Sequence, residues 1–96
     1  MESFSDFMKE GNIKDTYKIT EKLGEGQFGE VKKAIRRDGG DDDQYAVKIF
    51  KKSKMSTEDV FALTQEISIL QQIDHPNVVK LLELYDENDN FYMVFE

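Results

Sequence analysis

The glycine-rich run from Gly24 to Gly29 is the feature that most constrains how this chain folds. Alternating polar and apolar residues precede the run over 17–23 and predict a β-strand, and a second strand is predicted over 31–36. Glycines permit tight turns and let a phosphate approach the backbone N–H groups closely. We therefore predict a hairpin whose turn covers a phosphate-bearing ligand, although a plain connecting turn has the same pattern.

Two other phosphate-binding loops contain similar glycines, and both fit this sequence poorly. A Walker loop requires Lys followed by Ser or Thr after its last glycine, whereas Glu30 and Val31 follow here. A dinucleotide-binding loop requires a helix after the glycines and an acidic residue about 20 positions later. This chain has a predicted strand there, and the later position holds Lys48-Ile49-Phe50. A flap between two antiparallel strands is the better interpretation.

Lys48 ends an apolar stretch, Tyr45-Ala46-Val47, within a third predicted strand over 44–50. A lysine in a buried strand requires an anionic partner. A lysine on an edge strand instead keeps its amine in water, and the sequence leaves this alternative open.

A helix is predicted from the segment Ser56–Asp59, which has the pattern of a capping box, to residue 72 or 73. Pro76 prevents the helix from continuing. Leu63, Ile67, Leu70 and Ile73 form one apolar arc, and Glu66 falls within it. A carboxylate on a core-facing arc requires a partner, and Lys48 is the obvious one. The alternative is a helix rolled so that Glu66 lies at the edge of the arc.

Two further strands are predicted over 79–85 and 91–95, joined by a polar turn. The short connections indicate an α+β fold with a five-stranded antiparallel sheet and one main helix. Residues 1–14 are expected to be an N-terminal extension, with Phe4, Phe7 and Met8 at the spacing of a single helical turn, and residues 15–96 to be one domain.

Composition narrows the possible functions. The 96 residues include no cysteine, which excludes disulfides, thiolate catalysis and cysteine metal sites. The net charge of -7 disfavours a nucleic-acid partner. No apolar run has the length of a membrane span. We expect a cytoplasmic protein without a membrane span.

Together these motifs resemble the N-terminal lobe of eukaryotic protein kinases of the serine/threonine type. Leu23–Val31 is similar to the glycine-rich loop of that family, Ala46-Val47-Lys48 to its ATP-anchoring lysine motif, and His75–Val79 to the turn after its helix. Tyr92–Glu96 is similar to the strand that enters the hinge. The resemblance covers about residues 15–96 and is greatest to calcium/calmodulin-dependent and calcium-dependent protein kinases.

The resemblance implies an ATP site and gives roles to its residues. Lys48 would contact the phosphates and Glu66 would orient Lys48, as the two catalytic residues. The backbone at Gly24, Glu25, Gly26, Gln27, Phe28 and Gly29 would hold the phosphates, Leu23, Val31 and Ala46 would enclose the adenine, Phe95 would be the gatekeeper, and the backbone of Glu96 would meet the adenine edge.

The family's catalytic loop and its Asp-Phe-Gly motif do not occur among these residues. The resemblance therefore implies that Mg²⁺ is ligated outside this chain, that the expected partners are ATP, a protein substrate and a C-terminal lobe, and that the chain alone is inactive. No metal site is expected within the chain. A pseudokinase or interaction lobe, which binds nucleotide or partners without catalysis, remains the alternative.

Overall fold

The computed structural model describes residues 8–9, 11–26, 28–39, 44–72 and 80–96, without the side chains of 8 and 68–72. Five antiparallel strands form the central sheet, as the sequence predicts. They are β2 (Tyr17–Glu25), β3 (Glu30–Arg36), β4 (Gln44–Lys51), β5 (Leu81–Asp86) and β6 (Asn90–Phe95). A two-residue strand, β1 (Met8–Lys9), is added at one edge, so the order is β1-β5-β6-β4-β3-β2.

The main helix, α2, runs from Thr57 to Gln72 and follows a short 3₁₀ turn, η2 (Lys52–Lys54). The predicted capping box is confirmed. The N–H of Asp59 donates to Ser56 Oγ at 3.1 Å, and the N–H of Ser56 donates to Asp59 Oδ2 at 2.8 Å. Two otherwise unpaired donors at the start of the helix are thereby satisfied. The predicted stop at Pro76 lies outside the described residues.

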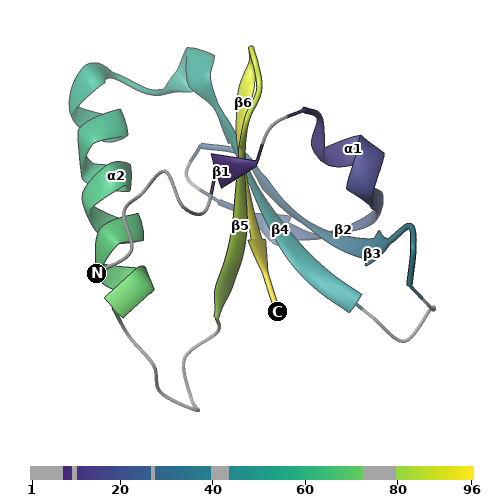
Figure 1. Cartoon of the computed structure of the whole chain (residues 1–96). Helices are drawn as coiled ribbons and strands as arrows, with labels where there is room; N and C mark the ends of the chain where they lie inside the picture. Colours follow the sequence, from purple (N-terminus) through teal and green to yellow (C-terminus); the bar gives the residue numbers. More distant parts are fainter. Residues whose placement is uncertain (1–7, 10, 27, 40–43, 73–79) are drawn as a thin grey trace.

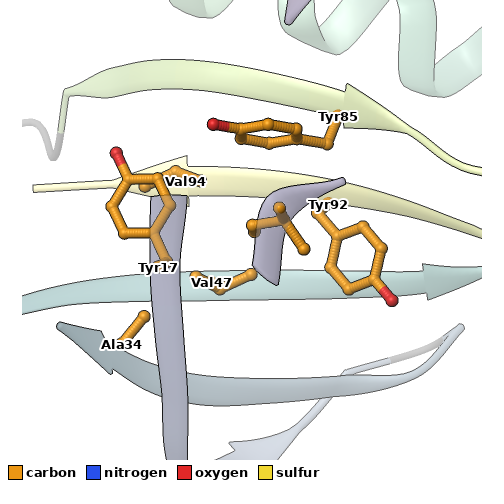
Figure 2. Close-up of a cluster of buried hydrophobic side chains, with 7 residues drawn as sticks. Tyr17, Ala34, Val47, Tyr85, Tyr92 and Val94 are labelled. Carbon is orange, nitrogen blue, oxygen red and sulfur yellow. The ribbon is translucent and has the colours of Figure 1, made fainter. Parts of the chain in front are cut away.

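Two hydrophobic cores lie on opposite faces of the sheet. The inner core, beneath α2, contains Leu63, Ile67, Leu81, Leu84, Met93 and Phe95. The outer core contains Ile13, Tyr17, Ala34, Val47, Tyr85, Tyr92 and Val94, most of which are labelled in Figure 2. Both cores draw on the central strand β6, because successive side chains of a strand point to opposite faces.

The segment before β2 packs onto the sheet more closely than a loose extension would. We call residues 8–9 and 11–16 the N-terminal strap. It contains β1, which pairs in parallel with β5, and a four-residue helix, α1 (Ile13–Thr16). In Figure 1, α1 and α2 lie on opposite sides of the sheet.

The prediction of a helical turn over Phe4, Phe7 and Met8 is wrong for Met8, which lies in strand β1. The two phenylalanines lie outside the described residues. Three residues at helical spacing carry too little periodicity to outweigh pairing with a sheet edge. The division of the chain at residue 14 remains a prediction, although the buried Ile13 already belongs to the outer core.

Candidate nucleotide site

The glycine-rich run lies in the hairpin between β2 and β3, as predicted, but Gly24 and Glu25 belong to the end of β2 rather than to the turn. Gly24 pairs with Val31, and Glu25 pairs with Glu30. The N–H of Gly26 donates to the carbonyl of Gly29 at 2.7 Å and closes the turn. No helix follows the glycines, since β3 begins at Glu30, which agrees with the flap rather than the dinucleotide-binding loop.

This turn rests on the end of β4. The N–H of Lys51 donates to the carbonyl of Phe28 at 2.9 Å, and the rings of Phe28 and Phe50 lie 6.4 Å apart. Gly29 approaches β4 so closely that an added Cβ would lie 2.0 Å from the carbonyl oxygen of Ile49. An added Cβ at Gly24 would meet nothing within 4 Å. Gly29 is therefore required for contact with the strand, whereas Gly24 borders open space.

The acidic side chains beside the turn are paired with lysines. Lys22 lies beside Glu25 and is 3.6 Å from the carboxylate of Glu30, which Lys32 also approaches at 3.5 Å. The hydrogen bond with Lys22 lowers the pKa of Glu25, and the same bond raises the pKa of Lys22. All four side chains are partly or largely exposed, so these pairs contribute little stability. They do offset negative charge where phosphates would lie.

Lys48 lies on β4 opposite Met93 of β6 and on the face of the sheet that α2 covers. Its side chain is exposed, and its amine lies 5.8 Å from the centre of the Phe95 ring. Among the ion pairs of the described residues, none links Lys48 to Glu66. The two residues nevertheless line the same cavity.

The expectation that Glu66 lies on the buried arc of the helix is wrong, because its side chain is exposed. Leu63 and Ile67 are buried as predicted, with 8% and 2% exposed. Glu66 is one residue before Ile67, which rotates it about 100° around the helix and toward the cavity rather than the core. The structure thus matches the alternative in which the helix is rolled. Ile73 and the side chain of Leu70 lie outside the described residues.

A cavity of about 310 Å³ lies between the glycine turn, β4 and α2. Six residues predicted for the site line it: Gly26, Phe28, Gly29, Val31, Lys48 and Glu66. The described lining has one cationic side chain, that of Lys48, and three carboxylates, those of Glu30, Asp59 and Glu66. An anionic ligand would therefore depend on Lys48, the backbone N–H groups and added cations for charge balance.

Of the residues predicted to enclose adenine, Val31 lines this cavity, whereas Leu23 and Ala46 do not. Ala46 is half-buried and pairs with the buried Phe95, while Leu23 is 57% exposed. The N–H of Glu96 donates to the carbonyl of Lys80 at 3.1 Å. Gln27 lies outside the described residues. The structure therefore gathers both predicted catalytic residues, part of the predicted phosphate-binding run and Val31 around one cavity. Gly24 and Glu25 of the predicted phosphate-binding run do not line it.

Sequence reasoning missed several lining residues, among them Phe50, Asp59 and Met93. Two of these residues, Asp59 and Met93, could have been identified from their spacing or pairing with predicted site residues. Asp59 precedes Glu66 by seven residues, or two helical turns, so the two share a helix face. Met93 is opposite Lys48 once strands β4 and β6 are paired.

Two other features are absent from the described residues: a cluster of metal-ligating side chains and a membrane-spanning helix. No group of three or more histidine, cysteine, aspartate or glutamate residues in the described part is arranged to hold a metal ion. None of the described helices has the length and apolar character needed to span a membrane.

The protein kinase domain family matches residues 17–96, well over half of the chain, so the chain belongs to the protein kinase family. It is 40% identical over 90 residues to calcium-dependent protein kinase 5 of Plasmodium falciparum, covering 93% of this chain and 15% of that protein. It is 40% identical over 88 residues to serine/threonine-protein kinase RAD53 of Saccharomyces cerevisiae, covering 92% of this chain and 10% of that protein.

A solved structure agrees with this assignment. The twitchin kinase fragment of C. elegans matches with a TM-score of 0.76 and 27% identity, covering 93% of this chain and 19% of that one. The predicted α+β fold, a five-stranded antiparallel sheet with one main helix, is therefore confirmed as the N-terminal lobe of a protein kinase. The chain spans only 10–19% of these three proteins.

Proposed function

We propose that this chain is the ATP-binding lobe of a serine/threonine protein kinase that acts on protein substrates. The observation that carries the proposal is the cavity in which the glycine turn, Lys48 and Glu66 meet. The open space at Gly24 fits a bulky phosphate group, because an added Cβ there meets nothing within 4 Å. Backbone N–H groups of such a turn form a cradle for anions.

In this proposal, ATP when bound supplies the γ-phosphoryl group that is transferred to the substrate. The turn residues hold the phosphates, and Lys48 contacts them through its amine. Leu23, Val31 and Ala46 hold the adenine, with Phe95 behind it and the backbone of Glu96 at its edge. Mg²⁺ is ligated by residues outside this chain, so the charge neutralisation that phosphoryl transfer needs is shared with a C-terminal lobe.

Glu66 has a switching role in this proposal. Its exposed carboxylate faces the cavity that contains Lys48, without an ion pair between them among the described residues. A rotation or inward shift of α2 brings the two side chains together and orients Lys48 for the phosphates. The separated arrangement is then the inactive position of the helix, and the paired arrangement is the active one.

The test is calorimetric titration of Mg²⁺-ATP into the 96-residue chain, with the Lys48→Met variant alongside. We expect weak binding that Lys48→Met weakens about tenfold. The reason is that Lys48 provides the one cationic side chain among the described residues that line the cavity. Lys18→Met, which changes an exposed lysine of β2, is the control and should bind like the unchanged chain. Equal binding by all three proteins would contradict the role of Lys48. Absence of nucleotide binding would favour the interaction lobe instead.

A further inference from the structure

We propose that the N-terminal strap holds β5 in position and, through β5, sets the position of α2, the helix that carries Glu66. The strap precedes the residues that match the protein kinase domain, which begin at Tyr17. The mechanical link rests on contacts of the strap itself. Its consequence for catalysis rests on the proposed function.

The strap is part of the folded core rather than a leader beside it. Ile13 is 0% exposed and lies in the outer core with Tyr17 and Tyr85. The backbone N–H of Ile13 donates to Glu87 Oε2 at 2.9 Å, which ties the start of α1 to the end of β5. Burial of a complete isoleucine side chain contributes roughly 2 kcal/mol. Removing the strap would expose the outer face of the sheet.

Strand β1 pairs with the two residues of β5 at which the two cores meet. Met8 is opposite Leu84, and Lys9 is opposite Tyr85. Leu84 belongs to the inner core with Leu63 and Ile67 of α2, whereas Tyr85 belongs to the outer core. Neighbouring side chains on a strand point to opposite faces, so a shift of β5 disturbs both cores together. The strap and α2 therefore share β5 as a common support.

Side chains reinforce this backbone pairing. The amine of Lys9 lies 3.7 Å from one carboxylate oxygen of Glu83, and the phenol of Tyr17 donates to the other at 2.5 Å. The pairing of β5 with β6 shifts between Leu81 and Glu83, and the irregularity places Glu83 opposite Val94 of the outer core. Such irregularities redirect side chains. Glu83 thus joins the strap, β2 and β5 at one point.

Gly11 sets the path of the chain between β1 and α1. Its φ of +86° lies in the left-handed region that other residues adopt only with strain. The carbonyl groups of Lys14 and Thr16, farther along, accept hydrogen bonds from the side chain and backbone N–H of Arg37, respectively. The strap is consequently fixed at both ends, to β5 and to the residue that follows β3.

Hydrogen exchange of the ligand-free 96-residue chain tests the link. Ile13→Val removes one methyl group from the strap, and Ile19→Val makes the same change at a partly buried residue of β2 that packs on the same outer core. If the strap supports α2, Ile13→Val will accelerate exchange of amides in 57–67 and 81–86 about threefold or more, as expected for loss of one buried methyl group. Ile19→Val will leave the helix amides within about twofold of the unchanged chain.

Gly11→Ala is the second variant, because it strains the strap without changing the core. It should accelerate exchange in the same two segments. Equal acceleration by the two isoleucine variants, or unchanged helix amides in both Ile13→Val and Gly11→Ala, would overturn the proposal. Since no nucleotide is present, failure of ATP binding leaves this result unaffected. A failure here likewise leaves the role of Lys48 untouched.

Discussion

The two faces of the central sheet are closed in different ways. The outer face is sealed by the strap, and four of its core residues are 0% exposed: Ile13, Ala34, Val47 and Val94. The inner face is covered by α2 but keeps a cavity of about 310 Å³ beside Lys48. Figure 1 shows α2 on one side of the sheet, and Figure 2 shows the buried side chains of the outer core.

This difference gives the two faces of the sheet different mechanical roles: the outer face is a rigid support, and the inner face permits movement. A tightly packed face resists displacement, because close packing leaves no room for small shifts. A face with a cavity and exposed charged side chains permits a helix to move and a ligand to enter. In the proposed switch, the outer core would be the fixed reference against which the helix carrying Glu66 changes position.

The largest expected effect comes from placing a charge in the outer core. Val94 is 0% exposed, and Val94→Asp would bury an unpaired carboxylate, at a loss of about 3–5 kcal/mol in the free energy of unfolding. A small domain has only about 5–15 kcal/mol in total, so cooperative unfolding should be lost or shifted far downward. The measurement is thermal unfolding followed by circular dichroism.

Phe61→Asp is the matched comparison on α2, where the side chain is 64% exposed. This variant should unfold within a few degrees of the unchanged chain, because an exposed helix position tolerates a charge. If both variants unfold alike, the outer face is not the more tightly packed one.

Substitutions in the glycine turn, which borders the cavity of the inner face, should have an intermediate effect on stability. Gly29→Ala would bring a methyl group against the Ile49 carbonyl and lift the turn from β4, which we expect to destabilise the chain by about 1–3 kcal/mol. Gly24→Ala, with open space around it, should change stability by about 0.5 kcal/mol or less. Urea unfolding of both variants measures the difference. A reversed order would show that the turn is not held on the strand.

The smallest effect is a pH dependence of the stability of the folded chain, which arises from Tyr17 on the outer face. Burial first, and the hydrogen bond to Glu83 second, raise the pKa of Tyr17 above its usual value. In the unfolded chain the phenol of Tyr17 ionises near pH 10, whereas in the folded chain it stays neutral at that pH. Its stabilising contribution is thus complete below about pH 10 and is lost as the pH rises above that value.

Urea unfolding between about pH 8 and pH 11 would detect this loss. The unchanged chain should lose stability more steeply than Tyr17→Phe, which has no ionisable group at that position. Tyr85, whose pKa burial also raises, is present in both proteins and cancels in the comparison. Parallel curves would mean that Tyr17 ionises as readily in the folded chain as in the unfolded one.

Local patterns in the sequence predicted the elements that local physics determines. Alternation located β2, a mostly apolar run located β4, and the reciprocal hydrogen bonds of Ser56 and Asp59 explain why the start of α2 was predictable. The glycines and their flanking strands were sufficient to predict the turn. Each of these features depends on residues within a few positions of one another.

The strap could not be predicted in this way. A two-residue strand has no measurable periodicity, and its partners Leu84 and Tyr85 are far along the chain. The burial of Ile13 depends on those distant contacts. For the same reason the rotation of α2 was predicted only approximately, and Glu66 was placed in the core although its side chain is exposed.

Strand β6 has a consequence for how this lobe tolerates mutation. Tyr92, Met93, Val94 and Phe95 are all buried, because the strand lies between β4 and β5 and supplies both cores. Random substitution therefore meets four successive sensitive positions there. Along β2, at the sheet edge, Tyr17 alone is buried and the remaining residues are partly or fully exposed. Viable variants will accumulate in the edge hairpin before they appear in the strand that serves both faces.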